Sequence, residues 1–245
     1  MLIAPTHHES RAVLKALPDA RPAPGWDVPA WRAGELSIVE AGMGPEKTAA
    51  ILPHLDTLSV EALWLFGWCG GLSPELDVGD LVLAEATVLL DASEAHIDHP
   101  PPDALQELLR CLSGELNLRL VVGPVLTSDR VLASVGDKQA GAAMGAVAVE
   151  MEAGPLARWA AAHGVPFFHL RVVLDPAALA LPKTRLPTDK PGRRPAHVLL
   201  WHALTHPCQW PAFWRLFQQV GTTQKAMTRV IAALAGPGNP LGTRG

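Results

Sequence analysis

Three carboxylates lie at the ends of two predicted elements, two at the start of a helix and one at the end of a buried strand. Glu150 and Glu152 flank Met151 at the entry to a helical stretch, and Asp175 ends the apolar run FFHLRVVLD that follows it. In open α/β sheets, functional groups gather at the carboxyl ends of strands, in the crevice above the sheet. A largely apolar chain that brings carboxylates to such an edge is expected to hold or protonate a polar ligand there.

Composition narrows the class of protein. With 245 residues, 49% hydrophobic and 18% charged, the chain is a well-packed globule rather than a disordered one. A formal net charge of −4 without a basic run argues against binding of nucleic-acid phosphates. The N-terminus lacks the pattern of an export signal, and no apolar run reaches the ~18–20 residues that a membrane span needs. We expect a cytoplasmic protein without a membrane span.

Cysteine and histidine do not form a recognisable metal or disulfide framework. The three cysteines are widely spaced and odd in number, which is typical of a reducing compartment. His7 and His8, and the pair His96 and His99, each lack a convincing third ligand. We therefore expect no metal.

Strands and helices alternate along the chain. Apolar runs predict strands over 1–4, 36–41, 60–66, 79–90 and 118–126, and a last strand ending at Asp175. Helices are expected around Glu9, from Pro45, from Asp103, over 137–144 and after Glu152, whereas 18–30 and 91–102 are expected to be loops. This alternation predicts a mostly parallel sheet covered on both faces.

The chain is expected to form one domain over residues 1–235. Its core would cover 1–180, a proline-rich loop 176–196 and a helical extension 197–235, while 236–245 would be a disordered tail. Aromatic side chains are conspicuous in the extension, and a helical stripe in it consists of Phe213, Leu216, Phe217 and Val220.

Three segments together resemble one enzyme family. They are 67–84 (GWCGGLSPELDVGDLVLA), 127–132 (TSDRVL), and 148–153 with its continuation to 171–175. In order and spacing they are similar to the superfamily of purine nucleoside phosphorylases and methylthioadenosine/adenosylhomocysteine nucleosidases, over roughly residues 1–180. The resemblance implies a three-layer α/β/α sandwich around a mixed, partly barrel-like sheet. It also implies cleavage of the bond between ribose C1′ and a base.

The resemblance assigns the base and the sugar to different residues. Asp175 would protonate N7 of adenine as the bond breaks, which requires that burial raise its pKa. Glu152 would accept hydrogen bonds from the ribose hydroxyls and favour the cationic sugar of the transition state. Met151 would pack on the ribose, and Val131 and Leu132 would flank the base.

Further assignments concern the nucleophile and the pocket wall. Arg171 matches an arginine near the attacking water, and Glu9 sits where the hydrolases of the family carry the carboxylate that activates it. Glu150, Cys69 and Gly70 complete the expected substrate site. Arginines that would bind phosphate are not recognisable beside Gly70, and Glu9 would repel an anion. Hydrolysis is therefore favoured over phosphorolysis, with phosphate as a possible co-substrate and no other cofactor.

Some of these residues also have simple structural explanations, and the sequence differs from the family pattern at some positions. Asp175 precedes Pro176 and could be a simple turn residue, and Glu9 could be an ordinary first-turn acid of a helix. The family acid usually follows a serine, but here Leu174 precedes it, and Trp68 stands where small residues are usual. A nucleoside-binding module with impaired catalysis is thus an alternative.

The 5′ group of the substrate is suggested by the C-terminal half. Residues 171–182 (RVVLDPAALALP) and the aromatic helices resemble a hopanoid-associated phosphorylase-like branch, which implies an adenosylhopane-like substrate. A methylthioadenosine- or adenosylhomocysteine-like nucleoside, a futalosine-type hydrolase and a phosphate-dependent phosphorylase remain alternatives. The aromatic residues could equally pack the helices onto the sheet or form the interface of an expected homodimer.

Overall fold

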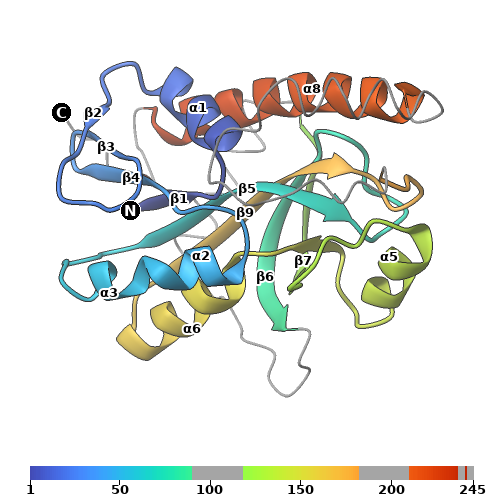
Figure 1. The fold of residues 1–245 in the computed structure, drawn as a ribbon, viewed down its shortest axis with the longest axis horizontal. Helices are drawn as coiled ribbons and strands as arrows, with labels where there is room; N and C mark the ends of the chain where they lie inside the picture. Colours follow the sequence, from blue (N-terminus) through green and yellow to red (C-terminus); the bar gives the residue numbers. More distant parts are fainter. Residues whose placement is uncertain (90–117, 182–209, 237–240, 242–245) are drawn as a thin grey trace.

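A nine-stranded mixed sheet organises the chain (Figure 1). The computed structural model describes residues 1–89, 118–181, 210–236 and 241. The strands lie in the order β2-β3-β4-β1-β5-β8-β7-β6-β9, and β9 also pairs with β5. Their bounds are β1 Leu2–Ala4, β2 Arg21–Pro22, β3 Ala30–Ala33, β4 Leu36–Glu40, β5 Leu63–Gly71, β6 Leu81–Leu89, β7 Leu120–Thr127, β8 Ala148–Glu150 and β9 Phe167–Asp175.

The second pairing of β9 closes part of the sheet into a ring. β5, β8, β7, β6 and β9 each pair with the next, and β9 returns to β5. The pairs β1–β4, β1–β5, β5–β9, β6–β7 and β7–β8 are parallel, while β2–β3, β3–β4, β5–β8 and β6–β9 are antiparallel. The expected mixed, partly barrel-like sheet is confirmed. Side chains of β5 and β9 that point inward line the interior of the ring.

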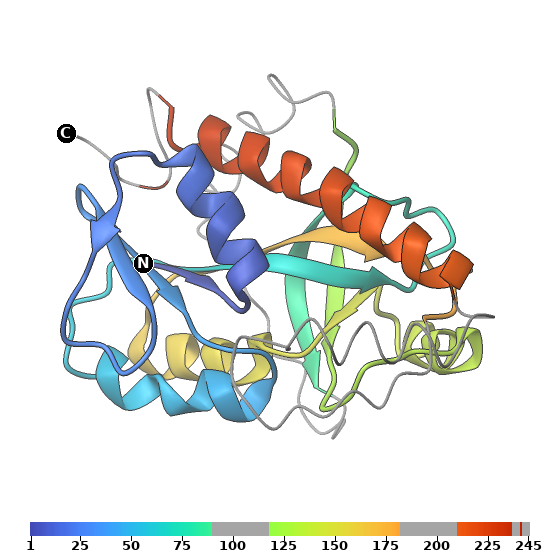
Figure 2. The same cartoon turned by 45° about the horizontal axis from the view of Figure 1, so that its top comes forward.

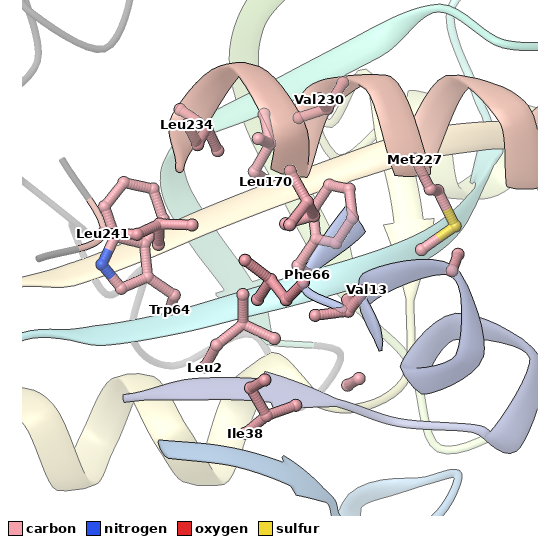
Figure 3. Close-up of a cluster of buried hydrophobic side chains, with 14 of the residues drawn as sticks. Leu2, Val13, Ile38, Trp64, Phe66, Leu170, Met227, Val230, Leu234 and Leu241 are labelled. Atoms are coloured by element: carbon pink, nitrogen blue, oxygen red, sulfur yellow. The ribbon is translucent and has the colours of Figure 1, made fainter. Parts of the chain in front are cut away.

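Helices α1 (His7–Ala16) and α8 (Trp210–Leu234) cover one face of the sheet (Figure 1). Figure 2 shows α1 crossing beside α8, and the two helices pack together. Their apolar faces meet the outward side chains of β1, β4, β5 and β9 in one cluster (Figure 3). Labelled members of that cluster are Leu2, Val13, Ile38, Trp64, Phe66, Leu170, Met227, Val230, Leu234 and Leu241.

The opposite face is covered by α2 (Pro45–Ala50), α3 (Leu52–Leu55) and α6 (Ala153–His163). Helix α6 ends at Gly164, whose φ of 64° is the left-handed conformation that glycine adopts without strain. Its buried side chains join those of α3 and of β1, β4 and β5 in a second cluster. The three-layer α/β/α arrangement that the family resemblance implies is confirmed.

Most predicted strands and helices are present, with differences at their ends. The strands at 1–4, 36–41, 79–90 and 118–126 correspond to β1, β4, β6 and β7, and α5 is Val135–Ala142. Strand β5 continues beyond the predicted strand over 60–66, through the glycine-rich segment to Gly71. The predicted loop over 18–30 contains β2 and the start of β3, and residues 148–150, at the expected entry to a helix, form β8. Strands this short present too little apolar pattern to be recognised.

The C-terminal part is only partly described. Helix α8 falls inside the predicted extension and includes the stripe at 213–220, but the expected loop at 91–102, the helix from 103 and residues 182–209 lie outside the described residues. Within the expected tail, Leu241 is 5% exposed and packs in the layer of α1 and α8. Among the described helices, none is both long and apolar enough to cross a membrane.

Candidate active site

Arg171 lies at the centre of a fully buried polar cluster inside the ring. It extends from β9 opposite Gly67 of β5, and its side chain is fully buried. Its Nε donates to His169 Nε2 at 2.9 Å, and Nη1 donates to the carbonyl of Trp68 at 3.3 Å. Because His169 Nε2 accepts this bond, the imidazole is neutral. Burial, and then the charge of Arg171, hold the pKa of His169 well below its usual range.

Glu150 and Glu152 hold the remaining nitrogen of Arg171. Nη2 donates to Glu150 Oε2 and, at 3.3 Å, to Glu152 Oε2. Glu150 ends β8 and accepts further bonds from Thr127 Oγ1 at 2.6 Å and from the backbone N–H groups of residues 152 and 153 at 2.8 and 2.9 Å. Glu150 thus accepts four bonds from the protein, whereas Glu152 accepts three, from Arg171 and from the backbone N–H groups of Gly44 and Met151, and keeps acceptor capacity for a ligand.

Glu152 also ties the helix α2 loop to the cluster. Its Oε1 accepts the backbone N–H of Gly44 at 2.9 Å, directly before α2 begins at Pro45. Burial raises the pKa of Glu152 to about 7; the cation of Arg171 opposes this, while Glu150 and Glu9 add to it. The N–H that opens α2 is therefore satisfied by an internal carboxylate.

Glu9 reaches the same cluster from α1. Its Oε1 accepts the backbone N–H of Trp68 at 2.7 Å, and its Oε2 accepts that of Thr6 at 2.7 Å. A Cβ built on Gly67 would lie 2.4 Å from Glu9 Oε1 and 2.6 Å from Arg171 Nη1, so a glycine is required where the two charged groups converge. Burial raises the pKa of Glu9, against the effects of Thr6, Arg171 and Trp68.

Asp175 stands apart from this cluster, at the end of β9. It is 5% exposed and lies against Gly70, where an ideal Cβ would be 3.4 Å from Oδ2 and 3.6 Å from Oδ1. Lys138 of α5, 1% exposed, donates from Nζ to Asp175 Oδ2 at 2.5 Å. Burial raises the pKa of Asp175 to about 6, although the Lys138 cation and its hydrogen bond lower it.

A bulge lies on β9 between Arg171 and Asp175. Cys69 pairs with Val173 and Gly70 with Asp175, so Leu174 is an extra residue on β9. Gly67 and Gly70, which lie against Arg171 and Asp175, are three residues apart, or about 10 Å along a strand. That separation suits a ligand whose sugar lies at one end and whose base lies at the other.

The other predicted substrate residues have different surroundings. Cys69 is buried among apolar ring residues, and burial raises the pKa of its thiol, which makes it an unreactive packing residue. Leu132 is 6% exposed in a cluster beside α5, whereas Val131 is 53% exposed. Met151 is half-buried between the two glutamates. Gly70 faces Asp175, so the structure brings Gly70 but not the Cys69 side chain into contact with it.

Lys138 is the functional candidate that sequence reasoning missed. It lies in the capping box of α5, where Ser134 and Asp137 give a plain helix-start signal. Nothing in that pattern indicates that the next lysine is buried. Among the described residues, no group of three or more His, Cys, Asp or Glu side chains is placed to hold a metal ion, and His96 and His99 lie outside them.

The chain is similar in sequence to known proteins. A family model of the phosphorylase superfamily matches residues 24–190. Futalosine hydrolase of Streptomyces coelicolor is 29% identical over 183 residues, which are 66% of this chain and 70% of that protein. Aminodeoxyfutalosine nucleosidase of Campylobacter jejuni is 28% identical over 157 residues, 58% of this chain and 69% of that one.

A solved structure extends the likeness in fold to nearly the whole chain. The methylthioadenosine/adenosylhomocysteine nucleosidase of S. pneumoniae, solved with a transition-state inhibitor, superposes with a TM-score of 0.67 at 17% identity, over 95% of this chain and 98% of that one. The family model, which spans all strands of the ring and the Arg171 cluster except Glu9, decides the assignment. The chain belongs to the phosphorylase superfamily.

Proposed function

We propose that the protein is a nucleosidase that cleaves the N-glycosidic bond of an adenosine-type nucleoside by attack of water. The observation that carries the proposal is the pair of polar sites about 10 Å apart along β5, a carboxyl acid at Gly70 and a carboxylate–guanidinium cluster at Gly67. The nucleosidase relatives support the same reaction class.

Asp175 is suited to the protonation step. Adenine is a poor leaving group until N7 carries a proton, and an acid transfers that proton best when its pKa lies near the working pH. Burial brings the pKa of Asp175 to about 6, close to that condition. Its Oδ2 is taken by Lys138, so Oδ1 is the atom that we assign to the base.

Glu152 is suited to the sugar. It keeps acceptor capacity beyond its bonds to Gly44 and Arg171, and its ionised form would accept the ribose hydroxyls and stabilise the positive charge that develops at C1′. Glu150 then acts as the fixed partner of Arg171 that holds the cluster in place.

The charge of the cluster favours water over phosphate. Glu9, Glu150 and Glu152 surround one arginine, and four of its five N–H donors bond to other groups of the protein. The N–H of Gly44, which an anion could otherwise use, is bonded to Glu152. An incoming phosphate would meet carboxylates, whereas a water molecule beside Glu9 could be deprotonated as it attacks.

The direct test is release of base by the purified protein. Methylthioadenosine, adenosylhomocysteine, inosine and futalosine are incubated with and without phosphate, and base and sugar are separated by chromatography. We expect free base and the corresponding free sugar, which keeps its 5′ substituent, at the same rate in both buffers. Sugar 1-phosphate as the product would replace hydrolysis by phosphorolysis, and tight adenine binding without turnover would instead support a binding module.

Asp175→Asn tests the mechanism within that assay. Since a positioned acid contributes about 10²–10⁴-fold, this variant should lose at least 10²-fold in kcat. An unchanged rate would remove Asp175 from the reaction.

The 5′ group is the finer part of the proposal. The similarity to a futalosine hydrolase and an aminodeoxyfutalosine nucleosidase favours a futalosine-type substrate. A lipophilic group, as in an adenosylhopane-like nucleoside, is the second candidate, because Trp214 of α8 presents a side chain that is 64% exposed. Trp214→Ala should lower turnover of lipophilic nucleosides selectively, and equal loss on methylthioadenosine would count against that candidate.

A further inference from the structure

Lys138 is buried in an unusual way for a lysine. Its side chain is 1% exposed, and its Nζ faces three oxygen atoms of one short segment. Nζ donates to Asp175 Oδ2 at 2.5 Å, to the carbonyl of Pro176 at 2.8 Å and to that of Leu179 at 2.9 Å, with a longer contact of 3.5 Å to the carbonyl of Asp175. Three short bonds match the three hydrogens of an ammonium group, so Lys138 is charged.

The bonds of Lys138 fix the carboxyl group and the chain after it together. The carbonyl of Pro176 also accepts the N–H of Leu179, and the N–H of Leu181 donates to the carbonyl of Ala133 at 2.8 Å. The segment that follows β9 is thereby closed onto α5 and onto the loop that carries Val131 and Leu132. One ammonium group thus joins the candidate acid to the candidate base-binding loop.

The strand itself cannot supply this support. Leu174 and Pro176, the neighbours of Asp175, have no side chain that donates a hydrogen bond, and Leu174 is the extra residue of the bulge. On its other side Asp175 faces Gly70, which has no side chain. A carboxyl group at a bulged strand end would otherwise be free to rotate away from the base.

We propose that Lys138 is the positioning residue of the acid: its ammonium group holds Asp175 Oδ2 and the 176–179 turn, so that Oδ1 faces the leaving base. This inference rests on the proposed nucleosidase function. It does not require Lys138 to touch the substrate. It assigns to α5, rather than to β9, the task of orienting the acid.

The test compares two leaving groups in the same protein sample. Methylthioadenosine needs a protonated base to depart, whereas 4-nitrophenyl β-D-riboside releases a stable anion without an acid. The ratio of the two kcat values is therefore a measure of acid catalysis that does not depend on the folded fraction. Lys138→Met should lower this ratio at least 10-fold, and Asp175→Asn should lower it in the same direction, since both impair proton transfer.

Two variants control for charge and for folding. Lys138→Arg keeps the cation but cannot place its planar donors on the same three oxygens, so the ratio should fall by less. Lys15→Met removes an exposed lysine of α1 and should leave the ratio unchanged. If Lys138→Met gives no soluble protein, Lys138→Arg carries the test.

The two possible failures look different. A ratio within twofold of the unmodified protein in the Lys138 variants would overturn the positioning role and leave the nucleosidase function standing. Release of neither adenine nor nitrophenolate by the unmodified protein would instead remove the proposed function.

Discussion

Asp175 and Glu152 have raised pKa values for the same main reason, which is burial, but different neighbours act against it. The Lys138 cation lowers the pKa of Asp175, which settles at about 6. Arg171 lowers that of Glu152, but Glu150 and Glu9 raise it again, and it settles at about 7. The group assigned to the base therefore has the lower pKa, and the group assigned to the ribose has the higher one.

These values predict a narrow pH profile. The reaction needs Asp175 protonated, so its rate falls as the pH rises above about 6. It also needs Glu152 ionised, so the rate falls as the pH drops below about 7. The profile of kcat/KM with methylthioadenosine should therefore be a bell with its maximum between these values.

Variants assign the two limbs of the bell. Glu152→Gln removes the group that must be ionised, so the acidic limb should flatten while the alkaline limb remains. A profile that keeps both limbs in Glu152→Gln would show that another group controls the acidic side.

Strand β5 contributes through residues that have no side chain. Gly67 leaves room for Glu9 and Arg171, and Gly70 leaves room for Asp175. A strand that lines a site in this way brings its backbone close to a ligand, at the cost of packing contacts.

Gly67→Ala should damage the cluster. The new methyl group would lie 2.4 Å from Glu9 Oε1, and both charged side chains are held by other bonds, so they cannot simply move away. We expect a loss of about 1–3 kcal/mol in the free energy of unfolding and a fall in kcat. Urea unfolding and the base-release assay measure the two effects.

Gly136→Ala is the matched control for that experiment. Its ideal Cβ meets only Ser134 Oγ at 3.9 Å, and alanine is the better helix former. Equal effects of the two substitutions would contradict the steric argument.

The elements differ in how far the sequence predicts them. Long apolar strands such as β6 and β7, and helices with clear start signals such as α1, are recognisable because their patterns are local. β8 is not, because its three residues are defined by pairing with strands far away in the chain. The closure of β9 onto β5 joins residues about a hundred positions apart, and no local pattern encodes it.

The residues of the candidate site also differ in how far the sequence predicts them. Asp175, Glu152, Glu9 and Arg171 were assigned through the family resemblance, and the structure brings the last three into one cluster. Lys138 was not, because its burial depends on how α5 packs against the turn after β9. Cys69 was expected to line the pocket, and its side chain packs among apolar residues that include Val82 and Val173.

Across the whole molecule, both ends of the described chain share one apolar layer. Leu2 of β1 and Met227 of α8 are fully buried in the same cluster as Phe66 and Leu170 of the ring strands. The ring that carries the site is therefore stabilised by a helix from the far end of the sequence.

Met227→Ala should accordingly weaken the entire fold. Loss of a fully buried methionine side chain costs about 2–5 kcal/mol, and we expect one urea transition, monitored by circular dichroism and by activity, that shifts to lower urea. Lys225→Ala, two residues earlier on an exposed face of α8, should shift it by no more than about 0.5 kcal/mol. Separate transitions for activity and structure would show that α8 and the ring unfold independently.

Because of the bulge at Leu174, spacing along the sequence of β9 does not equal spacing along the paired strand β5. Asp175 is four positions after Arg171 on β9, but their partners on β5 are only three positions apart. Deleting Leu174 would leave every functional residue in the sequence and would restore a regular ladder. Asp175 would still pair with Gly70, but the bend and the extra twist that a bulge adds to its strand would be lost. A single non-polar residue thus sets the angle at which the acid leaves the end of the strand.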